Sequence, residues 1–331
     1  MPGGWARGNM MRRLAFGVLF SGVVLASAIG APHASAEPCR WVARDLPVPE
    51  GSEFARTSGS SDSNRFIVGE AKVGEDFGES GLLWDDGAVT RLPSAGSDLI
   101  AVRPRDVNDS GLVVGRQNLL LEQRSLAFRY RDGAYELLET PAGHSSQAKA
   151  VNNLGDVAGE IWRSDTPNDR QVVVWPHDGP AKGFLSGPAV GISDDGRLVQ
   201  VAGTSVFVTD VASGQQVELP DMSQPVVFDN DRVLYPTSSG LGEWNLAGEQ
   251  VMTWEGGTWP SGRSASGHLV FGFAGGVASL WQEGIRFALG SEKQPVMAQA
   301  YHSDVTDEGV LIGTYHGPGG SSHPARWFRC G

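Results

Sequence analysis

The nine-residue phrase VNDSGLVVG, Val107 to Gly115, returns 44 residues later as VNNLGDVAG, Val151 to Gly159. Further copies, some of them eroded, lie on both sides: Ser63 to Gly69, Ile192 to Gln200, Phe228 to Tyr235, Arg263 to Gly272 and Val305 to Gly313. Successive copies are separated by roughly 35 to 46 residues, a period typical of repeat architectures. This repeat therefore constrains the fold more than any other feature of the sequence.

Each repeat unit has the signature of four short strands. A strand ending in Val or Ile meets a turn of Asn, Asp and Gly, residues that tolerate the positive φ of a tight hairpin, and a β-branched second strand follows. A third strand carries an aromatic residue, as in AFRYRDG (Ala127 to Gly133), and a fourth often ends in Leu-Pro, as in VTRLP (Val89 to Pro93). Four-stranded units of about 40 residues are typical of β-propellers. We predict an all-β, seven-bladed β-propeller with four antiparallel strands per blade.

Two other all-β architectures were weighed against the propeller. A two-sheet sandwich does not explain why the phrase recurs in register, and the coils of a β-solenoid are usually shorter than these units. Gly is abundant, with 45 residues, and charged residues make up 19% of the chain. That composition favours many short strands joined by tight turns over a helical bundle.

The last unit lacks its fourth strand. The segment PARWFRC, Pro324 to Cys330, reads as a third strand and is followed only by Gly331, whereas CRWVARDLPVP, Cys39 to Pro49, ends in Leu-Pro like the other fourth strands. We predict that this N-terminal strand completes the last blade and closes the ring, which pairs edges that would otherwise be exposed. Closure would bring Cys39 and Cys330 together, and two cysteines in an exported protein are expected to form a disulfide, with two free thiols as the alternative.

The N-terminal segment has the order of a secretory signal. Basic Arg12 and Arg13 precede the apolar run Leu14 to Ala26, and small residues follow up to Ala36. We predict a signal peptide over residues 1–36, cleavage between Ala36 and Glu37, and a single propeller domain over residues 37–331. The general secretory and twin-arginine routes both remain open, as does a start codon downstream of Met1.

The predicted mature chain is acidic and has no long apolar run. The net charge of the full chain is −12, which opposes binding to nucleic acid because such a protein gains nothing from counterion release. A membrane-spanning helix needs about 20 apolar residues, and no segment after the signal reaches that length. We therefore predict a secreted, extracellular protein, monomeric and without a membrane span.

The repeats resemble a known family. The third strands Leu126 to Gly133, Gly81 to Gly87 and His323 to Phe328, together with the repeated phrase, resemble the HAF repeats of bacterial extracellular proteins, which are named for a His-Ala-Phe triplet. No copy keeps the full triplet, and the middle units match poorly. The resemblance implies an exported, propeller-like bacterial protein and supplies no catalytic residues to carry over.

One face of the predicted propeller carries long connections. The second-to-third-strand connections vary in length, and four of them are long: Glu70 to Ser80, Arg116 to Ser125, Glu160 to Arg170 and Thr314 to His323. Function is concentrated on variable loops held by a rigid scaffold. We therefore place the candidate site on this long-loop face, beside the last unit and the first three.

Polar and aromatic residues near the predicted innermost strands and on the long loops are the candidate ligand-binding residues. They are Arg103, Arg105, Gln147, Lys149, Trp162, Trp259, Tyr301, His302, Tyr315 and His316. Aromatic rings with Arg and His suit a sugar or a small anion, through stacking and bidentate hydrogen bonds. We predict a binding or interaction module for a glycan, a small anionic ligand or a protein. The alternative for these residues is an ordinary surface without a ligand.

Metal and catalytic motifs are weak. DVNDSG, Asp106 to Gly111, resembles the start of a calcium loop but lacks the downstream Glu, and a β-turn explains it. His316 and His323 do not have zinc-site spacing, so we predict no metal and no cofactor. Asp106 and Asp304 would suit acid–base chemistry on a sugar if their carboxyl groups lay about 5–9 Å apart. A carbohydrate-active lyase or hydrolase and a structural surface protein are the alternative functions.

Overall fold

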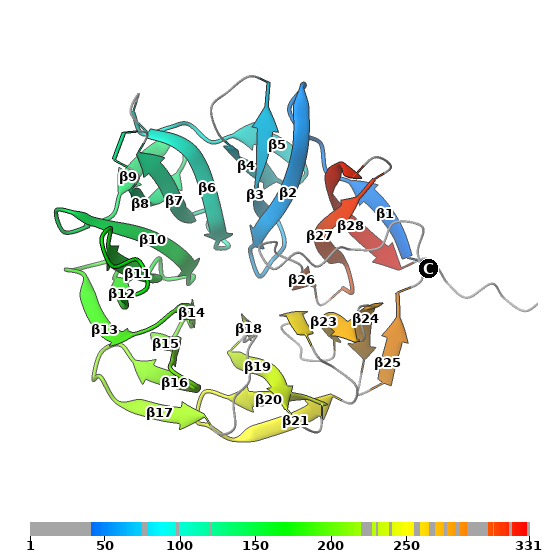
Figure 1. Cartoon of the computed structure of the whole chain (residues 1–331). Coiled ribbons are helices and arrows are strands. Elements are labelled where there is room, and N and C mark those ends of the chain that lie inside the picture. Colours follow the sequence, from blue (N-terminus) through cyan, green and yellow to red (C-terminus); the bar gives the residue numbers. More distant parts are fainter. Residues whose placement is uncertain are drawn as a thin grey trace, which may run out of the picture. The chain divides into compact units, whose positions relative to one another are not determined.

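The computed structural model describes residues 41–74, 79–96, 99–119, 121–122, 124–219, 227–229, 231–237, 240–254, 259–264, 269–274, 277–282, 285–289, 304–306, 308–317 and 320–329. The described chain contains 28 β-strands in seven four-stranded antiparallel sheets. Figure 1 shows these sheets as the blades of one ring, so the prediction of a seven-bladed β-propeller is confirmed.

We number the blades along the chain. Blade 1 is β2 (Ser52–Ser60), β3 (Phe66–Val73), β4 (Ser80–Asp85) and β5 (Ala88–Arg91). Blade 2 is β6 (Leu99–Val107), β7 (Val113–Leu119), β8 (Ser125–Arg131) and β9 (Ala134–Leu137). Blade 3 is β10 (His144–Val151), β11 (Val157–Arg163), β12 (Arg170–Trp175) and β13 (Lys182–Ser186). Blade 4 is β14 (Ala189–Ile192), β15 (Arg197–Ala202), β16 (Ser205–Asp210) and β17 (Gln216–Leu219).

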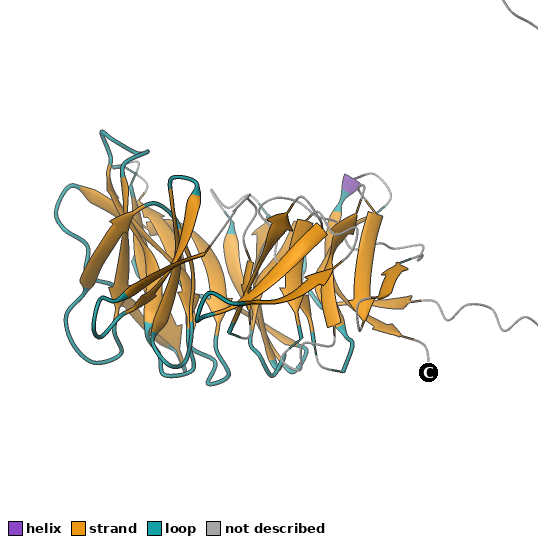
Figure 2. Cartoon of the chain, turned by 90° about the horizontal axis from the view of Figure 1, so that it is seen from below, coloured by secondary structure: helices purple, strands orange, loops and turns teal. Residues whose placement is uncertain are grey.

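The remaining blades follow the same order. Blade 5 is β18 (Val227–Asp229), β19 (Arg232–Thr237), β20 (Gly240–Asn245) and β21 (Gln250–Trp254). Blade 6 is β22 (Trp259–Arg263), β23 (Leu269–Ala274), β24 (Val277–Gln282) and β25 (Ile285–Ala288). Blade 7 is β26 (Asp304–Val305), β27 (Leu311–His316), β28 (Ser322–Arg329) and β1 (Trp41–Asp45). The first strand of each blade lies innermost (Figure 1), and the loops gather at the two ends of the strands (Figure 2).

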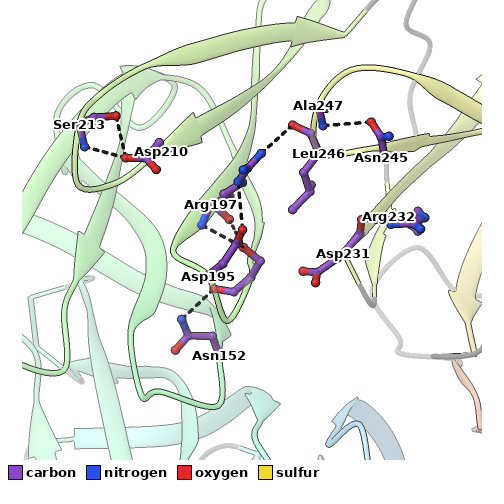
Figure 3. A network of polar contacts seen from close by, with 11 residues as sticks. Asn152, Asp195, Arg197, Asp210, Ser213, Asp231, Arg232, Asn245, Leu246 and Ala247 are labelled. Atoms are coloured by element: carbon purple, nitrogen blue, oxygen red, sulfur yellow. Dashed lines mark hydrogen bonds and ion pairs between the residues drawn. The ribbon is translucent and has the colours of Figure 1, made fainter.

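The repeated phrase forms the turn between the first two strands of a blade, and it also joins neighbouring blades. Within blade 2, the Asn108 side-chain oxygen accepts hydrogen bonds from the backbone N–H groups of Ser110 and Leu112, at 3.1 and 3.0 Å. Its side-chain amide donates to the carbonyl of Asn152 in blade 3, at 2.8 Å. Asn152 in turn donates to the carbonyl of Ser193 in blade 4, at 2.9 Å. Figure 3 shows Asn152 reaching the turn of blade 4 that carries Asp195 and Arg197.

The polar residues of the phrase have two different roles. In the two full copies only the glycine adopts a positive φ, 77° at Gly111 and 91° at Gly155, whereas Asn64 and Asp231 adopt it in the copies of blades 1 and 5, which lack that glycine. Asn108 is therefore required for its two-sided hydrogen bonding and not for an unusual backbone conformation. The phrase recurs because each blade must attach to the next in the same way.

The leucine and aromatic positions of the repeat build the core between blades. Leu46, Leu92, Leu138, Leu219 and Leu289, each at the end of a fourth strand, are all buried. The third-strand Trp84 and Trp175 are also buried, and their indole N–H groups donate to the carbonyls of Pro47 and Glu139, beside a leucine of the preceding blade. The clusters formed in this way hold adjacent blades together by burying apolar area.

The N-terminal strand closes the ring as predicted. β1 pairs with β28, and Trp41 lies opposite Arg329 in the register. The Leu46 N–H donates to the Pro324 carbonyl at 2.9 Å, as Leu92 N–H does to Gly81 and Leu138 N–H does to Ala127 in complete blades. The segment from Trp41 to Leu46 therefore serves as the fourth strand of blade 7.

Several predictions fall outside the described residues. The signal peptide, its cleavage site at Ala36 and Glu37, and both cysteines, Cys39 and Cys330, lie there. Within the described part of the chain, no helix is long and apolar enough to span a membrane.

Candidate anion site on the inner strands of blades 1 to 3

A β-bulge recurs on the innermost strands. At one shared position, the pairing between the first and second strands skips a residue in blades 1, 2, 3, 4 and 6. The residues skipped at this position are Ser58, Arg105, Lys149, Val190 and Ser261, and blades 1 and 2 have a further shift nearer the start of the strand, at Glu53 and Ala101. A bulge leaves its extra residue unpaired and re-aims its side chain. In blades 2 and 3 that residue is a cation, which places Arg105 and Lys149 in equivalent positions on neighbouring inner strands.

A second set of equivalent residues lies in register across the first two strands of each blade. Arg56 lies opposite Glu70 in blade 1, and Gln147 lies opposite Glu160 in blade 3. In blade 2 the same position holds Arg103 opposite Arg116. Like charges directly opposite each other destabilise a strand pair, so blade 2 carries an electrostatic cost that its neighbours avoid.

Two glutamates of blade 1 compensate part of this charge. Glu70 is almost completely buried and accepts a hydrogen bond from Arg56 Nε at 2.5 Å. Its other oxygen lies 3.8 Å from Arg103 Nε. Glu79, on the long connection between β3 and β4, ion-pairs with Arg103 at 2.5 Å and accepts a hydrogen bond from Arg56 at 3.2 Å. Arg56 and Arg103 therefore share two carboxylates.

One glutamate serves several donors in blade 3. The Glu160 side chain is fully buried and ion-pairs with Lys149 at 2.5 Å and with Arg170 at 2.7 Å. It also accepts a hydrogen bond from Gln147 at 2.7 Å. Burial alone would raise the pKa of Glu160, but the charge of Lys149 and the hydrogen bonds from Lys149, Arg170 and Gln147 together lower the pKa below its usual value. Glu160 is therefore held ionised.

Arg105 and Arg116 have no carboxylate partner among the described residues. Among the described residues, none accepts a hydrogen bond from the Arg105 guanidinium or forms an ion pair with it. Arg116 donates one hydrogen bond, to Gln147 Oε1 at 3.2 Å. Burial, together with the positive charges of Arg105 and Arg103, lowers the pKa of Arg116 to about 10. Burial also lowers the pKa of Arg105. These shifts indicate that the cations of blade 2 are crowded and partly dehydrated.

The described cluster holds more positive than negative charge. Its members are Arg56, Arg103, Arg105, Arg116, Lys149 and Arg170 on one side and Glu70, Glu79 and Glu160 on the other. We call these nine residues the cation cluster. In a chain whose net charge is −12, a local excess of three positive charges favours an anion at this place.

The predicted site residues separate into two groups. The structure brings Arg103, Arg105, Gln147 and Lys149 together in or beside the cation cluster. Trp259 lies on β22 of blade 6 at the register position of Arg56 and Arg103, and its side chain is exposed. His316 is exposed at the end of β27 and hydrogen-bonds with Ser322.

Two predicted aromatic residues are buried instead. Tyr315 is 4% exposed, packs in the core of blade 7 and donates its hydroxyl hydrogen to Asp45 at 2.8 Å. Trp162 is buried beneath the Arg170 guanidinium, which lies 4.6 Å from its ring centroid. Both rings therefore support the scaffold and do not present a free face to a ligand. Tyr301 and His302 lie outside the described residues.

The carboxylates of Asp106 and Asp304 have structural partners. Asp106 accepts hydrogen bonds from the backbone N–H of Val107 and of Val151 in the next blade, both at 2.8 Å. Asp304 accepts from Val305 N–H and from the Ser60 hydroxyl. They belong to blades 2 and 7 and join their own strands to the following blade. Their geometry shows a role in holding the ring together.

Sequence reasoning missed most of the cation cluster. Glu70, Arg116, Glu160 and Arg170 enter the sequence analysis only as ends of long connections, and Arg56 and Glu79 do not enter it. One signal was available: the residue after the glycine of the second strand is Glu70, Arg116 and Glu160 in the first three units. This alternation of charge at one repeat position indicates residues that meet from adjacent blades.

Comparison with known proteins gives a fold and no family. No family model matches the chain, and no curated protein matches it in sequence. An oligogalacturonate lyase solved in complex with manganese is similar, with a TM-score of 0.61 at 10% identity over 88% of this chain and 97% of the other. The protein U3-55K has a TM-score of 0.57 at 14% identity over 87% and 98%.

A third similar structure is part of a larger enzyme. A puromycin-hydrolysing peptidase from Mycobacterium tuberculosis has a TM-score of 0.55 at 13% identity, over 87% of this chain and 54% of that one. At such identities the likeness establishes the propeller fold and nothing about ligands or chemistry.

Proposed function

We propose that this protein is a secreted, extracellular binding module that holds a small anionic ligand, such as a carboxylate-bearing glycan, at the cation cluster. The observation that carries the proposal is the pairing of Arg103 with Arg116, with Arg105 beside them and no carboxylate partner for Arg105 or Arg116 among the residues that the structure describes. Three guanidinium groups on one blade offer the planar, bidentate donors that suit carboxylate or phosphate.

The position of the cation cluster supports a ligand-binding role. Glu79 lies on the connection between β3 and β4 of blade 1, and Arg170 begins β12 directly after the corresponding connection of blade 3, which places the cluster on the side of the long loops. The side chains of Arg103, Lys149 and Arg170 remain 28 to 37% exposed, so solvent and a ligand can reach them. An exposed aromatic ring on an inner strand, Trp259, would suit stacking on a sugar ring.

The state of the carboxylates favours binding over acid–base catalysis. Acid–base chemistry on a glycan requires a carboxylic acid that can give up a proton near neutral pH. In the described part of the cation cluster, Glu70, Glu79 and Glu160 each ion-pair with arginine or lysine. The partners of Glu160 lower its pKa, and all three carboxylates are engaged in orienting cations. The lyase among the similar structures therefore does not by itself favour a lyase activity here.

Titration calorimetry at fixed ionic strength tests the proposal. The probes are oligogalacturonate, inorganic phosphate and a neutral oligosaccharide of the same length as the first. We expect binding of at least one anionic probe and not of the neutral one, with an affinity that falls as salt rises because salt screens partly exposed charges. Phosphate binding without oligogalacturonate binding would identify a simple oxyanion site, and the reverse result would identify a carboxylated glycan site.

Two variants of blade 2 provide the matched comparison. Arg116→Gln removes a cation that lacks a carboxylate partner, and we expect a loss of about tenfold or more in affinity for the anionic probe. Arg129→Gln removes an arginine of the same blade whose partner is Glu136, outside the cluster, and should leave the affinity unchanged. Equal effects of the two variants, or no binding of any anionic probe to the wild type, would refute the proposal.

A further inference from the structure

We infer that Glu79 is an internal competitor of the anionic ligand, a carboxylate of the protein that occupies Arg103 until the ligand displaces it. The inference rests on the proposed anion-binding function and concerns what sets its affinity. It follows from the different ways in which Glu70 and Glu79 hold their arginines.

Glu70 is a fixed partner of Arg56. It is a strand residue directly opposite Arg56 in the register, its side chain is 3% exposed, and it accepts a hydrogen bond from Arg56 Nε. A ligand cannot replace such a group without opening the β2–β3 pair. Glu70 therefore belongs to the scaffold of the site.

Glu79 reaches Arg103 from a different element, and its other oxygen accepts a hydrogen bond from Arg56 at 3.2 Å. It lies one residue before β4, at the end of the long connection of blade 1, and reaches Arg103 on the inner strand of blade 2. The contact is an ion pair of 2.5 Å in which Glu79 Oε2 and Arg103 Nε both lack a hydrogen-bond partner. The Arg103 guanidinium thus has an unused donor, and Glu79 lacks the geometry of a strong bidentate pair.

An anionic ligand and Glu79 would offer Arg103 the same kind of partner, a negatively charged oxygen. Arg103 faces Arg116 and not a glutamate, so blade 2 contains no carboxylate for it in the register. Glu79 supplies the missing charge from blade 1, and a ligand carboxylate or phosphate that forms a bidentate pair with Arg103 would supply it better. Ligands with weak or absent charge cannot displace Glu79, so this residue also selects for charge.

Removal of the internal carboxylate should tighten binding. We expect Glu79→Gln to bind the anionic probe, oligogalacturonate or phosphate, about three- to tenfold more tightly, the range that one partly exposed ion pair can contribute. Glu122→Gln makes the same change in net charge on the equivalent connection of blade 2, where Glu122 pairs with Arg124. It should leave the affinity unchanged, which separates displacement from a general change in charge.

A double-mutant cycle locates the effect. The gain from Glu79→Gln should shrink in an Arg103→Gln background, because the competitor is then left only with its contact to Arg56 and no longer occupies the arginine that the ligand needs. Glu79→Asp, which keeps the charge on a shorter side chain, serves as the second variant if Glu79→Gln folds poorly, and its affinity should lie between those of the wild type and Glu79→Gln.

The results distinguish this inference from the function on which it rests. A wild type that binds no anionic probe refutes the proposed function. A wild type that binds, together with a Glu79→Gln variant that binds equally or more weakly, overturns only the inference and identifies Glu79 as a residue that positions Arg103.

Discussion

Ala43 lies directly opposite Trp327 in the antiparallel pair of β1 and β28, so the two ends of the described chain share one blade. Trp327 is fully buried there, and Trp41 and Ala43 pack against the same core cluster. The ring therefore depends on contacts between segments that the chain separates by almost its whole length.

The first prediction concerns the cysteines beyond these strands. Cys39 and Cys330 lie two and one residues outside the Trp41–Arg329 pair, and we predict that they form a disulfide in the exported protein. A crosslink over so long a loop is worth about 4–5 kcal/mol in the loop-entropy model. Peptide mapping without reduction should find a Cys39–Cys330 peptide, and Cys39→Ser should lower the free energy of unfolding by up to that amount. Two free thiols in the secreted protein would contradict the prediction.

The second prediction concerns the opposed arginines. Arg116→Glu would give blade 2 the Arg–Glu pair that blade 1 has in Arg56 and Glu70. We expect the free energy of unfolding to rise by about 1 kcal/mol, because a like-charge pair becomes an opposite-charge pair, while anion binding is lost. Chemical denaturation without ligand measures the gain. A variant that is less stable than the wild type would show that the arginine pair carries no electrostatic cost.

The third prediction concerns the link between blades. Asn108→Ala removes the cap of its own turn and the hydrogen bond to Asn152 of blade 3, and we expect a loss of about 2 kcal/mol in stability. Asn245 caps the turn before β21 through Ala247 and Glu249, both within its own blade. Asn245→Ala should therefore cost less, about 1 kcal/mol. Thermal unfolding compares the two variants, and an equal loss would argue against a role in joining blades.

The fourth prediction concerns pH. Asp62 lies in the turn between β2 and β3, where loss of hydration and the charge of Asp109 together raise its pKa to about 6, against a hydrogen bond from Asn153. Because the folded protein favours the protonated acid, the stability that Asp62 contributes is present below its unfolded pKa of 3.8 and is lost as pH rises through about 6.

Replacement of that acid tests the direction. Asp62→Asn should be more stable than the wild type above pH 6 and should flatten the stability profile between pH 4 and 6. Asp165 serves as the control because its pKa is shifted in the opposite direction: its hydrogen bond with Arg163 lowers the pKa. Asp165→Asn should be slightly less stable than the wild type at neutral pH. Unfolding midpoints across this pH range measure both, and a wild-type profile that rises from pH 4 to 7 through Asp62 would contradict the assignment.

Tertiary structure decided which polar residues meet. Glu79 lies in blade 1, yet it pairs with Arg103 of blade 2, and a bulge takes Arg105 out of the strand register. Tertiary structure also decided which aromatic rings are accessible, because Trp162 and Tyr315 are candidate binding residues by sequence but are buried. Nothing in their local sequence distinguishes a buried ring from an exposed one, and the packing of Arg170 and of the blade 7 core covers them.

The sequence by itself determined the number of blades, the four-strand unit and the closure by the N-terminal strand. Those features depend on local turn chemistry and on strand periodicity repeated in register, which each unit carries within its own residues. The cation cluster depends on distances between side chains of adjacent blades, and those distances exist only once the ring has formed.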